Sequence, residues 1–197
     1  MKEQKIEIKV KPLETKTIKI KISGDKLMMD KFPIEVKHKI LDKQTGKNKS
    51  AKENRDIKKE VELAIHKTSK GKIGYPSSAF KSGMVEATSF VGDKFFSKKL
   101  VKGSIKILNA EEGLIPIKSK KMDIVEHSIG PNTKFSPVFY DWECELLISY
   151  DAKNIAPEDI INLLNYAGFY FGVGAWAPRS KSSGEYGMYQ VMVKAKP

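Results

Sequence analysis

The sequence has little cysteine and no long hydrophobic run. Its 197 residues include one cysteine, Cys144, which has no partner for an internal disulfide and therefore favours a reducing compartment. No apolar stretch reaches the roughly 18 residues that a membrane-spanning helix needs. The first residues, Met1 to Ile6, lack the apolar core of a secretion signal. We therefore expect a cytoplasmic protein with no membrane partner.

Residues that commonly carry catalysis are also scarce. His38, His66 and His127 are the three histidines, and their wide spacing predicts no metal site. No motif indicates a cofactor. Cys144 lies in an alternating apolar segment, where cysteine is typical as a small core residue rather than a nucleophile. Asp30 is the one candidate catalytic residue, because a carboxylate beside a bound RNA strand can assist attack by a 2′-hydroxyl; its other interpretation is a solvated turn residue. We expect no enzymatic activity.

Basic residues, in contrast, are abundant, and almost all of them are lysine. Lysine and arginine number 36 against 24 acidic residues, for a net charge of +12, and only Arg55 and Arg179 are arginine. Such a charge favours a polyanion partner, nucleic acid first. Lysine acts as a point charge, whereas arginine offers the fork that reads base edges. The composition therefore predicts binding to the sugar–phosphate backbone, although lysine used only for solubility is an alternative.

The positive charge is concentrated between residues 31 and 72. This segment has 13 Lys and Arg residues against six Asp and Glu residues. Its middle, residues 43–55, has almost no apolar side chain and cannot offset its own ordering entropy. We interpret residues 31–72 as a basic, partly mobile insertion within a single domain, 1–197, with a helix-like piece on each side (34–41 and 57–65). A solvated loop without a task is the alternative. Its candidate nucleic-acid-binding residues are Lys47, Lys49, Lys52 and Arg55.

The rest of the chain alternates between strand-like and helix-like patterns. Alternation of apolar and polar residues predicts strands at 6–10, 18–22, 98–108, 142–150 and 188–194, with a turn at 23–25. Prolines placed for a first helical turn predict helices that begin at Pro76 and Pro157. Residues 111–137 contain several Gly and Pro residues and are predicted to be loop-like. The final order of strand, helix, glycine-rich loop and strand is half of a split βαβ unit.

Two segments are candidate nucleic-acid contacts. The first is the helix start that follows Tyr75, where Ser77, Ser78 and Lys81 would surround free N–H groups that favour a phosphate. The second is the glycine-rich loop, Gly172–Gly187, in which glycine lets the backbone approach a ligand or another segment closely. Its candidate binding residues are Gly172, Gly174, Trp176, Arg179, Lys181 and Gly184.

Within the glycine-rich loop, charge and aromatic rings would have different roles. Arg179 and Lys181 would contact phosphates, while Trp176, together with Tyr75 or Tyr186, would stack on bases. The loop is no dinucleotide fingerprint, because it follows a helix and lacks the third spaced glycine. A plain connection with Trp176 as a core residue is the alternative.

These two segments carry a resemblance to a known family. The helix start Tyr75-Pro-Ser-Ser-Ala-Phe-Lys-Ser-Gly-Met84 resembles that of the RAMP superfamily, which includes the backbone subunits of CRISPR effector complexes. The helix followed by Gly172-Val-Gly-Ala-Trp-Ala-Pro-Arg179 is similar to that superfamily's glycine-rich loop. The layout also resembles uncharacterised RAMP-type phage proteins, which would place the chain in a bacterial host cell.

The resemblance implies an α+β, modified ferredoxin-like or RRM-like fold, with an antiparallel sheet, helices on one face and a basic thumb-like insertion. It implies single-stranded RNA binding through the backbone and head-to-tail stacking into filaments. We therefore expect a non-catalytic protein that binds single-stranded RNA or DNA and oligomerises along the strand, in phage nucleic-acid metabolism. The alternatives are an RNA-cleaving endonuclease that uses Asp30 and an anti-defence protein that binds CRISPR components.

Overall fold

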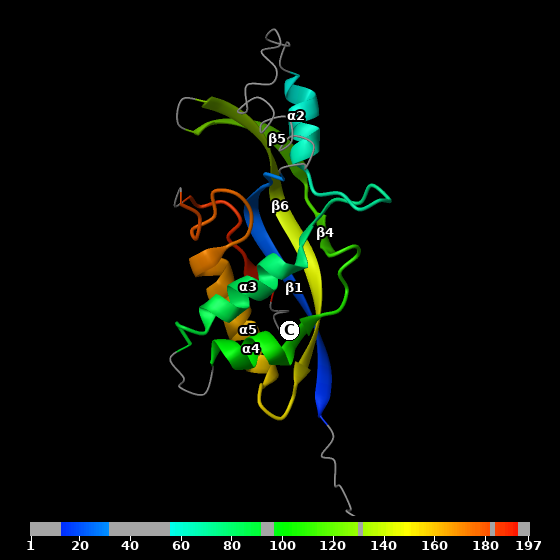
Figure 1. Ribbon diagram of the computed structural model, residues 1–197, viewed down its shortest axis with the longest axis vertical. Coiled ribbons are helices and arrows are strands. Elements are labelled where there is room, and N and C mark those ends of the chain that lie inside the picture. Colours follow the sequence, from blue (N-terminus) through cyan, green and yellow to red (C-terminus); the bar gives the residue numbers. More distant parts are fainter. Residues whose placement is uncertain (1–12, 32–55, 92–96, 130–131, 182–183, 193–197) are drawn as a thin grey trace, which may run out of the picture.

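The computed structural model describes residues 13–31, 56–91, 97–129, 132–181 and 184–192 (Figure 1). Among these residues, no helix is long and apolar enough to cross a membrane. The strands are β1 (Thr15–Met28), β2 (Gly74–Pro76), β3 (Ile105–Ile107), β4 (Leu114–Lys118), β5 (Lys121–Ile129), β6 (Asn132–Asp151) and β7 (Gln190–Val191). The helices are α2 (Ile57–Ala64), α3 (Ser77–Ala87), α4 (Lys98–Ser104), α5 (Pro157–Tyr166) and the π-helix η1 (Ala167–Phe171).

The strands form one sheet around the long pair β1 and β6. Its order is β2-β4-β6-β1-β7, and β3 and β5 also pair with β6. Every pairing is antiparallel. One helical connection follows β1 in the chain, and another joins β6 to β7. In the sheet, β1 lies between β6 and β7, and β7 is the edge strand. This is the split βαβ connectivity of the ferredoxin-like fold, and the predicted α+β class with an antiparallel sheet is confirmed.

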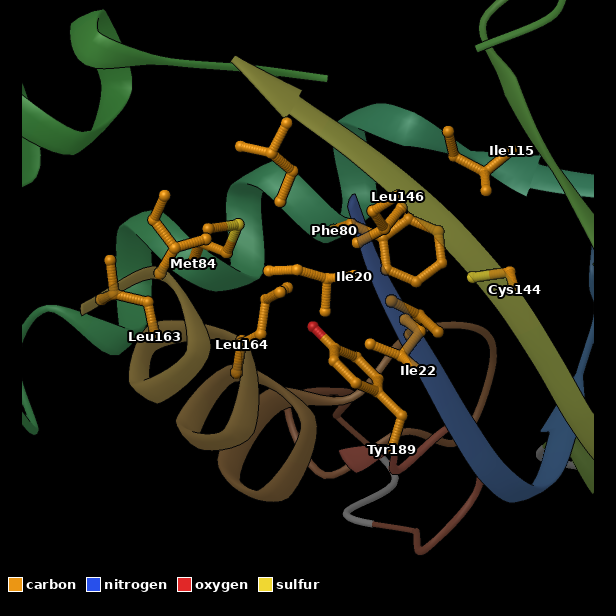
Figure 2. Close-up of a cluster of buried hydrophobic side chains, with 14 of the residues drawn as sticks. Ile20, Ile22, Phe80, Met84, Ile115, Cys144, Leu146, Leu163, Leu164 and Tyr189 are labelled. Carbon is orange, nitrogen blue, oxygen red and sulfur yellow. The ribbon is translucent and has the colours of Figure 1, made fainter. Parts of the chain in front are cut away.

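The sheet has one covered face and one face open to solvent. Ile20 and Ile22 point into the core, whereas Lys19 and Lys21 between them are exposed, as the two-residue period of a strand requires. Figure 2 shows Ile20 and Leu146 between the strands and the helices, close to side chains of α3 and α5. The hairpin of β5 and β6 extends beyond these helices, and α2 lies beside it (Figure 1).

Three helices follow the sequence pattern closely. In α3, Phe80, Met84 and Ala87 are buried, which is the apolar face predicted for a helix beginning near Pro76. In α5, Pro157 occupies the first turn, and the Asp159 carboxylate accepts a hydrogen bond from the Ala156 N–H at 2.8 Å. The helix predicted over residues 57–65 is α2. The predicted segments 6–10 and 34–41 lie outside the described residues.

The strand predicted over residues 98–108 is wrong in its first half. Residues 98–104 form α4, and only Ile105–Ile107 pair with β6. The Ser97 hydroxyl accepts a hydrogen bond from the Leu100 N–H at 3.1 Å and caps the helix. Val101 and Ile105 are both buried, and their spacing of four residues fits a helix as well as a strand.

The loop predicted over residues 111–137 is also wrong, because this region holds β4, β5 and the start of β6. Pro116 and Pro137 do not interrupt the sheet. Pro116 lies opposite Gly74 in the short β2–β4 pairing, and Pro137 lies opposite Ile124. The Pro137 carbonyl accepts a hydrogen bond from the Met29 N–H at 3.0 Å. Proline has no backbone N–H to donate but keeps its carbonyl acceptor, so it can pair with a neighbouring segment through the carbonyl.

Residues 23–25 do not end β1 in a turn. The strand continues to Met28, and Gly24 pairs with Trp142 of β6. A Cβ atom at Gly24 would come within 2.2 Å of the Met188 carbonyl oxygen and 2.6 Å of the Trp142 indole nitrogen. Glycine is therefore needed for close packing inside the strand. Because β1 continues to Met28, Asp30 follows directly after it, beside the candidate site.

Candidate nucleic-acid interface

The glycine-rich loop, Gly172–Gly187, runs along the end of β1. The Ala175 N–H donates to the Met28 carbonyl at 3.0 Å, which forms an antiparallel bridge. The Gly187 N–H donates to the Lys26 carbonyl, and the Val173 N–H donates to the Gly187 carbonyl at 2.9 Å. The loop therefore closes on itself and occupies the edge of β1 beyond the point where β7 ends.

Two glycines explain why this loop can lie so close to its neighbours. Gly174 has a φ of +94°, and a Cβ there would come within 2.6 Å of the Met28 carbonyl oxygen. A Cβ at Gly184 would come within 2.2 Å of the Trp176 carbonyl oxygen. The third predicted glycine, Gly172, is buried, and its N–H donates to the Ala167 carbonyl at 2.8 Å. Each of these glycines serves contact with the protein's own backbone.

Trp176 connects the loop to the hairpin of β5 and β6. Its ring meets the His127 ring edge-on, with the ring centres 5.5 Å apart. The His127 Nε2 atom is 2.8 Å from the Ser136 hydroxyl. Burial, followed by the positive charge of Lys134, lowers the pKa of His127. Trp176 is half-buried, so one part of its ring packs on the protein and another part reaches the surface.

Tyr75 connects the loop to the start of α3. Burial raises the pKa of Tyr75, while the positive charge of Arg179 and a hydrogen bond from the Gly174 backbone act in the opposite direction. The Tyr75 ring also packs edge-on against Phe80 of α3, with the ring centres 6.3 Å apart. The two segments that the sequence analysis selected independently therefore meet at one tyrosine.

The start of α3 presents serine and lysine beside this junction. The Ser77 N–H already donates to the Gly113 carbonyl at 2.9 Å, so that donor is used within the protein. Ser78 is exposed and Lys81, one helical turn further on, is half-exposed. No side chain caps this helix, which is consistent with a helix start that leaves other N–H groups for a phosphate.

Arg179 and Lys181 are both exposed on the same loop. The Arg179 N–H donates to the Phe171 carbonyl at 3.3 Å, which anchors its backbone at the end of η1. Its side chain is close enough to Tyr75 and Tyr189 to lower the pKa of both hydroxyls against the larger effect of burial. A fixed backbone with an exposed guanidinium group is suited to a phosphate contact.

Asp30, the candidate catalytic residue, lies directly after β1 and pairs with Lys134 of β6. Its side chain is 25% exposed and that of Lys134 is 14% exposed. The negative charge of Asp30 acts on both Tyr75 and His127, so the carboxylate lies within the same cluster. Its charge is compensated by the lysine ammonium group.

Cys144 is buried, and burial raises the pKa of its thiol. Within the described part of the chain, no three His, Cys, Asp or Glu side chains gather as a metal site would require. Lys47, Lys49, Lys52 and Arg55 lie outside the described residues.

No sequence pattern predicted the hairpin side of this cluster. Lys134, His127 and Ser136 come from the region that was predicted to be a loop, and nothing in their spacing indicated that they face Trp176 and Asp30. Ile124 and Val125 are both apolar and Glu126 and His127 are both polar, so the sequence here has no alternation that would predict a strand. We call the cluster formed by Asp30, Tyr75, Trp176, Arg179 and Lys134 the loop junction.

Comparison with known proteins finds similarity only to solved structures. No family model matches the chain, and no curated protein matches it. Among solved structures, Cmr6 from Pyrococcus furiosus aligns with 91% of this chain and 99% of its own, at 12% sequence identity and a TM-score of 0.40. The fold assignment rests on the strand order described above and not on this match.

Proposed function

We propose that the protein binds single-stranded nucleic acid through the sugar–phosphate backbone, without catalysis and with little sequence preference. The observation that supports the proposal is the meeting of the glycine-rich loop and the α3 start at Tyr75, near Arg179. Arg179 and Ser78 are exposed and Lys81 is half-exposed, so we expect the two segments to supply cations and hydroxyls to one strand-binding groove.

The proposal extends to assembly and setting. Copies stack head-to-tail along one strand, and the Lys and Arg residues between positions 31 and 72 add positive charge that attracts it. The RAMP resemblance of the two segments supports a cytoplasmic role in phage nucleic-acid metabolism. The absence of catalysis is supported by the pairing of Asp30 with Lys134, because a carboxylate held by a cation is a weaker base toward a 2′-hydroxyl.

The test is binding of fluorescein-labelled 20-mers, in RNA and DNA of several sequences, measured by anisotropy over a range of salt concentrations. About five phosphate contacts per subunit would give a log–log salt slope of about −3.5 on a single strand. Affinity that barely changes between low and moderate salt would contradict the proposal.

Charge-reversal variants locate the site. Lys81→Glu and Arg179→Glu should weaken binding to all sequences alike. Lys16→Glu changes the net charge equally but lies at the far end of β1, where Lys16 pairs with Tyr150, and it should have little effect. Loss of binding to one sequence alone would refute backbone recognition.

The rival function, RNA cleavage by Asp30, is tested with the same labelled RNA. Cleavage by the wild type that disappears in Asp30→Ala would establish the enzyme. Intact RNA in both samples, with binding retained, supports the proposal.

A further inference from the structure

A second surface of the molecule carries exposed aromatic rings. Phe90 and Tyr170 stack with their ring centres 4.1 Å apart, Tyr166 stacks on Tyr170 at 6.1 Å, and Phe169 meets Tyr170 edge-on at 5.0 Å. All four are exposed, and Phe169 is the most exposed, at 62%. We call these residues the aromatic row. They come from η1, the end of α5 and the segment after α3.

An open groove adjoins the aromatic row. It has a volume of about 820 Å³ and runs along β7 and the middle of β1. A smaller hollow of about 340 Å³ lies among the aromatic row, and Asn165 and Phe169 line both spaces. The groove and the row are therefore one continuous surface.

The groove is acidic although the chain is strongly basic. Among the residues that the structure describes, Asp25, Asp141 and Glu143 line it, against one lysine, Lys120. Lys120 pairs with Asp141 at 3.3 Å, and Asp25 has Lys26 beside it at 3.9 Å, outside the groove lining. Carboxylates disfavour a phosphate chain in this groove, while aromatic residues with a polar surround are typical of protein–protein contacts.

We propose that this surface, the aromatic row with the acidic groove, is the docking site for a lysine-bearing face of a second copy of the chain. The inference rests on the proposed function, since it assigns the contact by which copies stack along a strand. Charge complementarity identifies the occupant: the chain carries a net charge of +12, so a second copy offers lysines to a groove lined by carboxylates.

Head-to-tail stacking, as in the proposed function, determines the symmetry of the contact. In a two-fold contact each groove would meet a basic face of the other copy, and the pair would close as a dimer. In head-to-tail stacking the groove meets a basic surface of the next subunit, whose own groove stays open to another copy. Such a heterologous contact leaves one free groove and one free basic face at the ends, so it generates open stacks or rings.

The experiment measures the mass of the full chain by sedimentation, with and without a 60-nucleotide single strand. The wild type should form species larger than a dimer as its concentration rises, and high salt should weaken them. The variant with Phe169→Ala and Tyr170→Ala should associate at least tenfold more weakly. Leu108→Ala, which truncates an equally exposed apolar residue (52%) away from the groove, should behave as the wild type.

Mixing separates a heterologous contact from a two-fold one. The double variant keeps its basic face but lacks a working groove, so it should add to the end of wild-type stacks and shorten them. Binding of each variant to a 10-nucleotide strand should be unchanged. Loss of that binding would count against the proposed function, whereas loss of stacking alone tests the docking surface.

Three results would overturn the inference. The wild type could remain monomeric with the 60-nucleotide strand, the double variant could associate as strongly as the wild type, or photo-crosslinking could join Phe169 or Tyr170 to uridine. The last result would assign the aromatic row to bases rather than to a second copy. A melting curve for each variant confirms that the chain is folded.

Discussion

The loop junction and the aromatic row differ in how their polar and apolar groups are used. At the loop junction, rings are half-buried and packed on the protein, as Trp176 is on His127, while the exposed groups are charged. At the aromatic row, the rings themselves are exposed and the neighbouring charges are negative. Although the whole chain has a net charge of +12, the two clusters differ in local charge. We therefore expect them to suit different partners.

The largest expected effect comes from breaking the loop junction at Gly174. Gly174→Ala would adopt a positive φ and also place its Cβ against the Met28 carbonyl oxygen. Backbone strain of about 1–2 kcal/mol and overpacking of about 1–3 kcal/mol should lower the free energy of unfolding by about 2–5 kcal/mol. Urea denaturation monitored by tryptophan fluorescence measures this change.

Gly71→Ala is the matched control. Gly71 has a φ of +77° but no atom within 4 Å of its Cβ position, so only the strain of about 1–2 kcal/mol should remain. Equal losses in the two variants would show that the loop does not press on β1.

The next prediction concerns Tyr189, which lines the groove and packs against Trp142 and Phe80. Within the described residues its hydroxyl is buried without a hydrogen-bond partner. Removal of a buried unsatisfied group relieves a desolvation cost of about 1–3 kcal/mol. Tyr189→Phe should therefore raise the free energy of unfolding by about 1 kcal/mol, measured by urea denaturation, and leave strand binding unchanged. A destabilised variant would mean that the hydroxyl has a partner in solution.

Sequence reasoning succeeded where one physical signal dominated. The alternation of Ile18, Ile20 and Ile22 predicted a strand with one wet face, and the first-turn prolines predicted α3 and α5, because these patterns are local. Charge and glycine content selected the two segments that meet at Tyr75. The meeting itself was not predictable, since it depends on the path of β1 past Gly24.

The failures have a different cause. Residues 111–137 were predicted to be a loop because prolines such as Pro116 and Pro137 often end strands, but both lie within paired strands. The aromatic row escaped notice because Tyr166, Phe169 and Tyr170 have the spacing of a buried helix face. Exposure of such a face depends on what else covers it, and no local pattern in the sequence carries that information.

A smaller effect is expected at the ion pair of the loop junction. Asp30→Asn removes the negative charge but keeps the shape, and so removes the ion pair between Asp30 and Lys134, whose side chain is only 14% exposed. Because Asp30 retains some solvent exposure, the loss of stability should be about 1 kcal/mol rather than the larger cost of breaking a fully buried pair. Strand binding should strengthen, since the junction becomes more positive. Anisotropy at fixed salt tests this, with Asp123→Asn on β5 as a control that removes the same charge from the exposed pair with Lys121.

The smallest expected effect is a pH dependence of the unfolding free energy, which originates beside the loop junction and not at the aromatic row. Burial and Lys134 lower the pKa of His127 from its ordinary value of 6.5, so the folded chain takes up this proton less readily than the unfolded chain. Stability contributed by the neutral ring is therefore complete above pH 6.5 and declines as pH falls through 6.5 toward the lower folded pKa. The groups that act on the ring are Lys134, Asp30 and Glu60.

His127→Gln should consequently flatten the dependence of unfolding free energy on pH between 7.5 and 5.5, measured by urea denaturation at each pH. His66, whose pKa is also lowered by burial and by Lys31, contributes with the same sign, so His66→Gln should flatten it as well, and the two variants together more than either alone. Additivity is expected because the two rings have different cationic neighbours. Both variants should also change strand binding, since the His127 ring meets Trp176 and the His66 ring meets Tyr75, with ring centres 5.5 Å and 5.3 Å apart. Curves for His127→Gln and the wild type that run parallel over this range would mean that the ring is solvated and that the contact between Trp176 and the hairpin is not maintained in solution.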